Sequence, residues 1–326
     1  MAHSQNVGNN LLKYAMYIKL KELGFSPYIV GTIHKNHNIS FLKEVVKLKI
    51  IKNFSEIKKD EFDILIVNSD QTWNAFTPNF YDIAFLKFAN NWCKPKFVYG
   101  ASLGFKHWVF SKKDEIIAKN LLKNFTGISV REIDSAKLIK THLGFKVQYV
   151  LDPTLLINKR YYINLIKDYK SNILSQINNK KYIFAYILKN SSNIKNYLSI
   201  IKTKLNIPIF YVTIHQKNQV KEFLYGIFHS RGVVTNSFHG TVFSIIFNKP
   251  FATFRKRKND NRINNLINIF GIKDRVVDMN SVPNISLLKS PLIINKSKLK
   301  SLKSVSIQYL KKHLYYNKYS QFKNIF

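Results

Sequence analysis

The sequence predicts an α/β protein with two Rossmann-like domains, each built on a parallel sheet. Short apolar runs alternate with helical patterns along most of the chain, as in successive strand-helix-strand units. The alternation stops after Asp152 and restarts near Lys181. The 326 residues, of which 46% are hydrophobic, suffice for two domains that each bury a core. We therefore predict an N-terminal domain over 1–155, a linker over 156–180, and a C-terminal domain over 181–326 that ends in a basic helix.

The first domain is predicted to begin with a helix rather than a strand. A helical pattern over 9–24 ends at Gly24, and a second, lysine-rich helix is expected over 40–57. A strand should precede the loop at 6–10, so either the first strand is missing or the sheet starts at its second strand. The remaining strands are expected at 27–32, 62–69, 96–102, 126–132 and 147–152, and the remaining helices at 112–125 and 132–144.

The second domain repeats the alternation. Its strands are expected at 181–188, 207–214, 232–237 and 250–254, and its helices at 193–206, 219–230, 238–249 and 261–271. The basic segment 295–326 has a helical pattern, and we expect it to pack back across the domain junction.

The formal net charge of +34 predicts anionic partners. A nucleic acid, an anionic membrane surface and a phosphorylated or carboxylated substrate all have the right sign; the alternative is that most of the charge is solvated surface. No RNA-binding or helix-turn-helix motif accompanies the charge, so nucleic acid is not the expected partner. The single cysteine, Cys93, excludes an intramolecular disulfide. With no apolar stretch of about 20 residues, we expect a cytoplasmic protein that contacts the inner face of a membrane only peripherally.

The strongest local pattern is GVVTNSFHGTVFSIIF, residues 232–247. A β-branched run ends in small polar residues, the chain turns at Phe238, His239 and Gly240, and an apolar helix follows at once. This turn lies at the carboxyl edge of a parallel sheet, where open α/β folds bind ligands. Helix N-termini attract anions, a glycine allows a close backbone approach, and His239 can transfer protons near neutral pH. The structural alternative is a helix N-cap at Ser237 with a histidine that fills the turn.

Polar residues also follow strands of the first domain. Ser69, Asp70 and Gln71 end one strand, and Trp73 offers a flat ring that can stack on a sugar. The alternative is a cap followed by a core tryptophan. Ser102 ends the next strand among small residues, as a site of close approach requires.

Arginines supply candidate anion contacts. Arg131, at a strand-to-helix junction, can hold a carboxylate or phosphate with two parallel hydrogen bonds, or it can form an ion pair with Glu132 or Asp134. Asp152 is either a hinge-capping or a catalytic residue. The run Arg255 to Lys258 is either solvated surface or an electrostatic funnel for an anionic substrate.

Several chemistries lack their motifs. The sequence has no GxxxxGK[ST] phosphate loop, no GxGxxG, no HExxH and no paired cysteines. Nucleotide hydrolysis, dinucleotide redox chemistry and structural zinc are therefore disfavoured, and we expect no cofactor and no metal.

Six segments, taken in order, resemble the polysaccharide pyruvyl transferase family: NVGNNLLKYA, NSDQTWN, YGASLG, SVRE, LDPTLL and TNSFHGTVFSIIFNKPF. Together they extend from about Asn6 to Arg275. The resemblance implies two Rossmann-like domains similar to GT-B glycosyltransferases, with an active site in the cleft between them. It also implies a role in exopolysaccharide or capsule biosynthesis: transfer of the enolpyruvyl unit of phosphoenolpyruvate to a glycan or its lipid-linked precursor, giving a pyruvate ketal.

The resemblance assigns roles to residues of this chain. His239 would be the general acid-base group. The donor-binding residues would be Arg131, Ser237, Phe238, Gly240 and Arg262. The acceptor-binding residues would be Gly8, Asn9, Ser69, Asp70, Gln71, Trp73 and Ser102.

The chain also departs from the family. Some members place an arginine two residues before the His-Gly pair, where this chain has Ser237; Arg255, Arg257 or Arg262 would then replace that anion contact. Two other functions remain open: a GT-B-like glycosyltransferase that uses a nucleotide sugar, and a non-catalytic protein that binds anionic surfaces.

Overall fold

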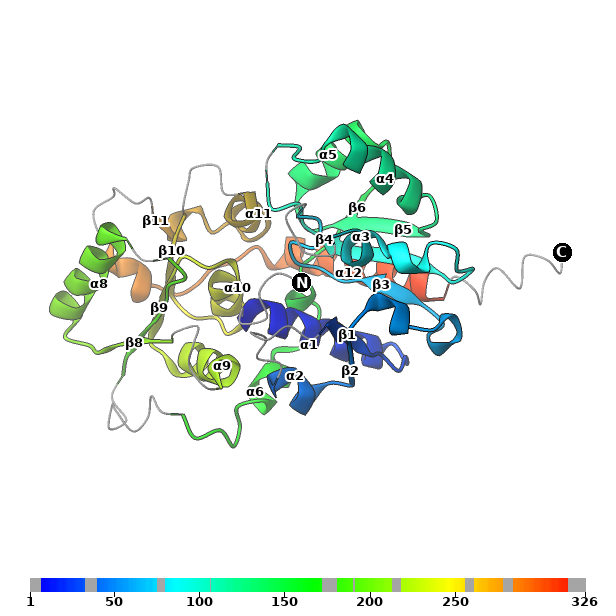
Figure 1. The fold of residues 1–326 in the computed structure, drawn as a ribbon. Helices are drawn as coiled ribbons and strands as arrows, with labels where there is room; N and C mark the ends of the chain where they lie inside the picture. The colour runs from blue at the N-terminus through cyan, green and yellow to red at the C-terminus, as the bar shows by residue number, and fades with distance from the viewer. Residues whose placement is uncertain are drawn as a thin grey trace. The chain divides into compact units, whose positions relative to one another are not determined.

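The computed structural model describes residues 7–32, 40–74, 80–105, 107–171, 181–189, 191–212, 218–255, 261–277 and 284–315. The chain divides into two compact units: unit 1, residues 1–156 with 300–326, and unit 2, residues 157–299. Each unit contains parallel strands covered by helices, which confirms the predicted fold class (Figure 1).

Unit 1 contains six described strands, all in parallel pairs. They are β1 (Ile29–Thr32), β2 (Leu48–Ile51), β3 (Leu65–Val67), β4 (Lys96–Ala101), β5 (Gly127–Val130) and β6 (Gln148–Tyr149). Among the described residues these strands form two ladders, β1-β2 and β3-β4-β5-β6. The helices are α1 (Val7–Glu22), α2 (Ser40–Val45), α3 (Phe80–Phe85), α4 (Lys112–Leu122), α5 (Ile133–Leu143) and most of α12 (Lys296–Leu314), with 3₁₀ helices at Phe54–Glu56, Lys59–Glu61, Lys87–Ala89 and Pro153–Leu155.

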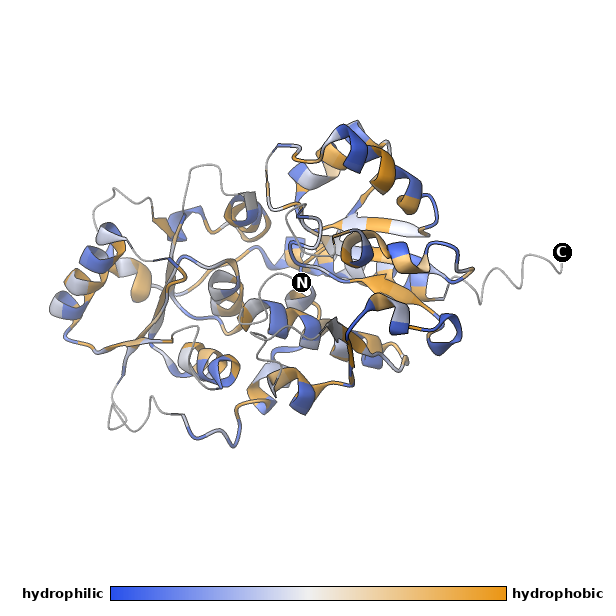
Figure 2. Cartoon of the chain, viewed as in Figure 1, coloured by the Kyte–Doolittle hydropathy of each residue, from blue (hydrophilic) through white to orange (hydrophobic). Residues whose placement is uncertain are grey.

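Helices cover both faces of the four-stranded ladder. Successive side chains of a strand point to opposite faces, so neighbours in β4 contact different helices. Val98 belongs to the apolar cluster that includes Ala118 and Leu122 of α4 and Ile139 of α5. The Phe97 ring instead stacks on a ring of α12. Figure 2 shows the resulting concentration of apolar residues along the strands.

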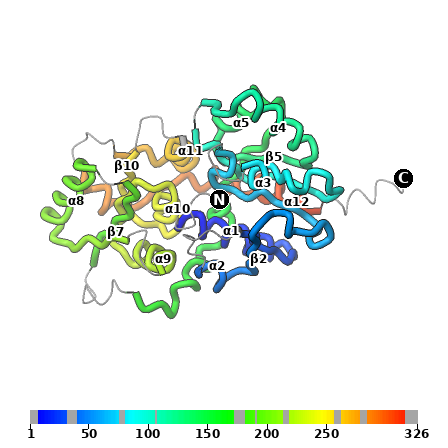
Figure 3. Tube along the Cα trace, in the orientation of Figure 1, coloured from blue at the N-terminus to red at the C-terminus, as the bar shows by residue number. Residues whose placement is uncertain are grey.

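The C-terminal helix α12 packs on unit 1, which corrects the predicted domain boundaries. The Tyr309 hydroxyl donates to the Val98 carbonyl at 2.8 Å, and the Ser306 hydroxyl accepts from the Leu151 amide at 2.9 Å. The His313 ring lies 5.5 Å from the Phe97 ring. Figure 3 shows the chain returning to the elements of its first half. The apolar face of β4 needs a cover, and the last helix of the chain supplies it. Residues 316–326 of the predicted basic segment lie outside the described residues.

Unit 2 contains a continuous parallel sheet of five strands in its described part, in the order β11-β10-β9-β7-β8. The strands are β7 (Ile183–Tyr186), β8 (Ile209–Tyr211), β9 (Gly232–Thr235), β10 (Phe251–Phe254) and β11 (Val276–Val277). The helices are α6 (Lys159–Asn164), α8 (Ser192–Leu205), α9 (Gln219–His229), α10 (Phe238–Ile246) and α11 (Asn261–Phe270), with 3₁₀ helices at Lys273–Arg275 and Ile285–Leu288. If the five strands are renumbered along the chain from β7, their spatial order is the 2-1-3-4-5 order of doubly wound folds. The direction in which strands are added reverses between β7 and β9.

The predicted linker belongs largely to unit 2. The Tyr162 ring of α6 packs edge-on against the Phe243 ring of α10, with centroids 4.8 Å apart. The hydroxyls of Tyr169 and Ser171 donate to the carboxylate of Glu222 on α9. These contacts fix the segment to the helices of unit 2, so unit 2 begins at Ile157. Residues 172–180 lie outside the described range.

One predicted helix is wrong. The lysine-rich segment 40–57 contains the six-residue helix α2, the strand β2 and a 3₁₀ helix. The alternating run VKLKII, residues 46–51, favours a half-buried strand, and β-branched residues favour strands.

Among the described residues, no helix is both long and apolar enough to cross a membrane.

Candidate active site

The turn between β9 and α10 carries the predicted catalytic residue, His239, together with three predicted donor-binding residues, Ser237, Phe238 and Gly240. Ser237 is the N-cap of α10: its backbone is extended (φ −101°, ψ 137°) and its hydroxyl accepts from the Gly240 amide at 3.4 Å. The first helical hydrogen bond runs from the Thr241 amide to the Ser237 carbonyl at 3.0 Å. Phe238 and His239 therefore occupy the first two positions of the helix, where the helix dipole favours an anion.

Gly240 is required for packing inside the turn. A Cβ atom at this position would lie 2.2 Å from the Thr235 hydroxyl oxygen. That oxygen donates to the Tyr186 carbonyl at 2.7 Å and accepts from the Ser237 amide at 3.1 Å. The sequence suggested that this glycine admits an anion, whereas in the structure it admits the side chain that ties the turn to β7.

Asn236 connects the two loops at the point where the strand order reverses. Its side-chain oxygen accepts from the Leu188 amide at 2.8 Å, and its side-chain nitrogen donates to the Lys189 carbonyl at 2.7 Å. Ligands of open α/β sheets bind at such a reversal, beyond the carboxyl ends of the strands. The loop after β7 is thus held beside the turn that carries His239.

His239 is well positioned but largely enclosed. The residue is 5% exposed, and its ring meets the Phe238 ring edge-on at 5.1 Å. An imidazole held in a fixed orientation at a helix N-terminus can serve as a proton-transfer group. Of the predicted arginines, Arg262 lies in the first turn of α11 and Arg255 directly follows β10; both are half-buried. Arg257 lies outside the described residues.

Arg131 lies at the centre of a buried ion network in unit 1. Its guanidinium contacts Asp152 at 2.6 Å, Glu132 at 3.1 Å and Asp70 at 3.3 Å, and its side chain is only 2% exposed. Burial opposes the charge, but the carboxylates of Glu132, Asp152 and Asp70 together outweigh it and raise the pKa of Arg131. The ion pair with Glu132, foreseen as the structural alternative, is present. Asp152 also caps a 3₁₀ helix by accepting from the Thr154 amide.

Asp70 adopts a backbone conformation that is unusual for a residue other than glycine. Its φ is +97°, and such conformations cost of order 1–3 kcal/mol. The surroundings hold it there: its carbonyl accepts from the Ser102 amide at 3.0 Å, and it forms an isolated bridge with Ala101. Local strain of this kind concentrates at functional sites.

Two predicted acceptor-binding residues are core residues. Trp73 is fully buried, its indole N–H donates to the Ala84 carbonyl at 3.0 Å, and its ring packs 5.3 Å from the Phe85 ring. It therefore cannot stack on a sugar, and the alternative of a core tryptophan is correct. Ser102 is also fully buried and accepts from the Gly104 amide at 3.2 Å, so it presents no hydroxyl to an acceptor.

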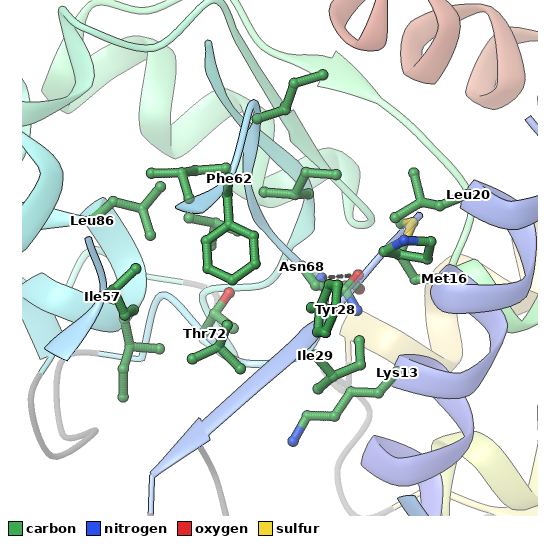
Figure 4. Close-up of a pocket in the computed structure, with 18 of the residues that line it drawn as sticks. Lys13, Met16, Leu20, Tyr28, Ile29, Ile57, Phe62, Asn68, Thr72 and Leu86 are labelled. Carbon is green, nitrogen blue, oxygen red and sulfur yellow. Dashed lines mark hydrogen bonds between the residues drawn. The ribbon is translucent and has the colours of Figure 1, made fainter. Parts of the chain in front are cut away.

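A cavity of about 430 Å³ in unit 1 brings four of the predicted acceptor-binding residues together. These four are Asn9, Ser69, Asp70 and Gln71; Gly8, at the buried start of α1, does not line it. Lys13 of α1 also lines the cavity (Figure 4). Burial lowers the pKa of Lys13, and the nearby charge of Asp70 partly opposes the shift.

Sequence reasoning missed Lys13, Asn68 and Asn236. Lys13 lies in a helical pattern whose lysines look like a solvated face. The amide nitrogen of Asn68 is buried with no hydrogen-bond partner among the described residues. Asn236 was visible only as a small polar residue at a strand end, because nothing in the sequence indicated its contacts with Leu188 and Lys189.

The family model for polysaccharide pyruvyl transferase matches residues 6–255, three quarters of the sequence. The chain belongs to this family. It is thus a member of a transferase family whose acceptor is a glycan. The match includes the turn at His239, the strands of unit 1 and all of the residues that line the cavity except Leu314. A search of curated proteins finds no significant match.

Solved structures share the fold at low identity. The MnaA–UDP co-structure from S. aureus is 14% identical, with a TM-score of 0.57 over 96% of this chain and 94% of that one. A putative UDP-N-acetylglucosamine 2-epimerase from Listeria monocytogenes is 13% identical, with a TM-score of 0.56 over 94% and 93%. The UDP-GlcNAc 2-epimerase from Methanocaldococcus jannaschii is 11% identical, with a TM-score of 0.56 over 91% and 96%. These similarities show a GT-B-like pair of Rossmann-like domains.

Proposed function

We propose that this family member transfers the enolpyruvyl unit of phosphoenolpyruvate to two hydroxyls of a cell-surface glycan or its lipid-linked precursor. The observation that carries the proposal is the position of His239, at the N-terminus of α10 and the carboxyl end of an interior strand. That position suits a donor with both a phosphate and a carboxylate.

The reaction balances without a cofactor. The two hydroxyl oxygens bond to C2 of the enolpyruvyl unit, the methylene carbon gains one proton to become a methyl group, and the C–O bond to phosphate breaks. One hydroxyl proton thus matches the new C–H bond, and the other leaves with phosphate or solvent. His239 transfers the proton to carbon.

The donor site in this proposal is formed by residues of unit 2. Ser237, Phe238 and Gly240 form the turn, and Arg255 and Arg262 supply the positive charge. Arg131 belonged to the expected donor set, but three carboxylates already surround its guanidinium. We therefore assign it to the support of Asp70.

The test is phosphate release from phosphoenolpyruvate in the presence of candidate glycans. We expect His239→Ala to lower the rate by about 10²–10⁴-fold, the usual contribution of general acid-base catalysis. His107→Ala, at an exposed position of unit 1, is the matched control and should retain full activity. Equal phosphate release by the wild-type chain and His239→Ala contradicts the proposal.

A nucleotide-sugar donor is the second candidate, because the similar solved structures include a complex with UDP. Thermal stabilisation by a UDP-sugar and not by phosphoenolpyruvate would favour it over pyruvyl transfer.

The charge of +34 also supports peripheral contact with an anionic membrane. Salt-sensitive binding to acidic liposomes tests that contact, and binding unaffected by His239→Ala, without phosphate release, would favour a non-catalytic surface binder.

A further inference from the structure

The parallel strands of unit 1 are interrupted where a doubly wound sheet has its central strand. Among the described residues, no strand lies between the ladders β2-β1 and β3-β4-β5-β6. A doubly wound sheet whose strands are numbered along the chain has the spatial order 3-2-1-4-5-6. Its strand 1 precedes the first helix and lies between strands 2 and 4, which correspond here to β1 and β3. A right-handed connection through α1 then leads from that strand to β1. The described strands therefore leave one position of that order open, between β1 and β3.

The cavity of about 430 Å³ lies at this position, because residues of both β1 and β3 line it. Figure 4 shows Met16 and Leu20 of α1 and Ile29 of β1 around it, with Ile57 and Leu86 on another side. Ile66 of β3 is only half-buried, whereas every residue of the neighbouring strand β4 is buried. Interior strands of a parallel sheet are buried throughout, as β4 is, so the partial exposure of Ile66 is typical of a strand at an edge.

The backbone edges on both walls are complementary to a strand. The Ile29 amide donates to the Lys47 carbonyl at 2.9 Å, so the N–H and C=O of the next residue, Val30, point away from β2. The Leu65 amide donates to the Pro95 carbonyl at 3.0 Å, so the same groups of Ile66 point away from β4. Val30 and Ile66 both line the cavity. Unpaired strand edges are templates for another strand.

We propose that this cavity is a strand-acceptor site, which binds an extended apolar peptide segment of about five residues parallel to β1 and β3. The bound segment would join the two ladders into one continuous sheet. It should be rich in valine and isoleucine on both faces, because an interior parallel strand is apolar throughout.

A peptide fits the walls better than a lipid chain or a sugar does. The edges at Val30 and Ile66 offer donors and acceptors on both sides of an apolar slot, and an acyl chain would leave all of them unsatisfied. The buried amide nitrogen of Asn68, at the end of β3, adds another donor without a partner among the described residues. Because Ser69 and Asp70 follow β3, a strand beside β3 would end next to them and support the strained turn.

The experiment compares three forms of the full chain: unextended, extended at its N-terminus by Val-Ile-Val-Ile-Val, and extended by Val-Pro-Val-Pro-Val. Proline cannot donate to a ladder, so the third form controls for apolar mass alone. We expect the first extension to slow amide exchange at Val30 and Ile66 by about tenfold or more and to raise the thermal midpoint. The proline form should do neither.

Two further measurements keep the test decisive. Met16→Trp fills the slot, so it should abolish the added protection at Ile66 in the extended chain while the unextended variant stays folded. The same Val-Ile segment, supplied as a separate peptide, should protect the same two amides at high concentration. The proposal is overturned if Val30 and Ile66 gain no protection from the Val-Ile extension. It is equally overturned if decanoate stabilises unit 1 as strongly as the Val-Ile segment does while the amides of Val30 and Ile66 still exchange at their original rate.

Discussion

The two units use the polar residues at their strand ends differently. In unit 2, Thr235, Asn236 and Ser237 bind backbone groups around one helix N-terminus and so shape the turn that carries His239. In unit 1, Asp70 and Arg131 bind each other and are buried. Equivalent positions at the carboxyl edges of two similar sheets thus build a turn at a helix N-terminus in one unit and an internal ion network in the other. The family's chemistry is therefore better sought in unit 2, with unit 1 as the support of a cavity.

The largest expected effect comes from breaking the ion network of unit 1. Arg131→Leu leaves the carboxylates of Asp70, Glu132 and Asp152 buried without their cation, and we expect a loss of about 3–5 kcal/mol in the free energy of unfolding. Denaturant unfolding measures it. If Arg131→Leu instead unfolds like the wild-type chain but has a raised KM for the donor, Arg131 contacts a ligand. The strand ends of the two units would then not differ in role.

Acid should weaken the packing of α12 on unit 1. Burial, with Lys312 nearby, lowers the pKa of His313 from its usual 6.5 to about 4. The unfolded chain then takes up a proton before the folded chain does, so stability is full above pH 6.5 and falls between pH 6.5 and about 4. The loss should reach up to about 3 kcal/mol.

Thermal midpoints measured across this pH range test the effect. His313→Gln removes the titrating group at similar size, so its stability should vary less with pH in the same window. An unchanged pH dependence in that variant would show that other groups dominate the acid sensitivity of unit 1.

A smaller effect is expected from crowding the turn of unit 2. Gly240→Ala forces its new methyl group against Thr235, and overpacking of this kind costs about 1–3 kcal/mol. A double-mutant cycle with Thr235→Ala should show a favourable coupling, because the second change removes the closest atom. If the stability losses of the two substitutions were simply additive, the close contact with Thr235 would not be the reason for a glycine at position 240.

The smallest effect is expected from removing one helix N-cap in each unit. Ser111 caps α4 on the surface of unit 1, and its hydroxyl accepts from the Asp114 amide at 3.1 Å. Ser237 caps α10 at 3.4 Å. Replacement of either serine by alanine should cost about 1 kcal/mol in thermal unfolding. Only Ser237→Ala should also change the KM for phosphoenolpyruvate; equal kinetics in the two variants would remove Ser237 from the donor site.

The sequence predicted the elements well where local pattern and tertiary packing agree. The turn at His239 was recognised because β-branched residues, a capping serine and an apolar helix follow one another within sixteen residues. The segment 40–57 was misassigned because its lysines hid the alternation of a strand. For Trp73 and Arg131 the sequence left two interpretations open. Whether an aromatic ring or a guanidinium faces a ligand or the core depends on tertiary contacts, here with Ala84, Phe85 and Asp152, which the local sequence does not reveal.

The return of α12 to unit 1 determines the order in which the units can be completed during synthesis. Unit 2 is one uninterrupted stretch, residues 157–299, whereas unit 1 needs α12, which follows unit 2 in the sequence, to cover β4. Domains fold as the chain emerges, usually in order from the N-terminus. Here the order is inverted: unit 2 has all its residues first, and Phe97 and Tyr99 lack their contacts with α12 until that helix has been synthesised. A chain that stops before α12 would therefore expose the aromatic face of β4, so the folding of unit 1 depends on the helix that lies farthest from it in the sequence.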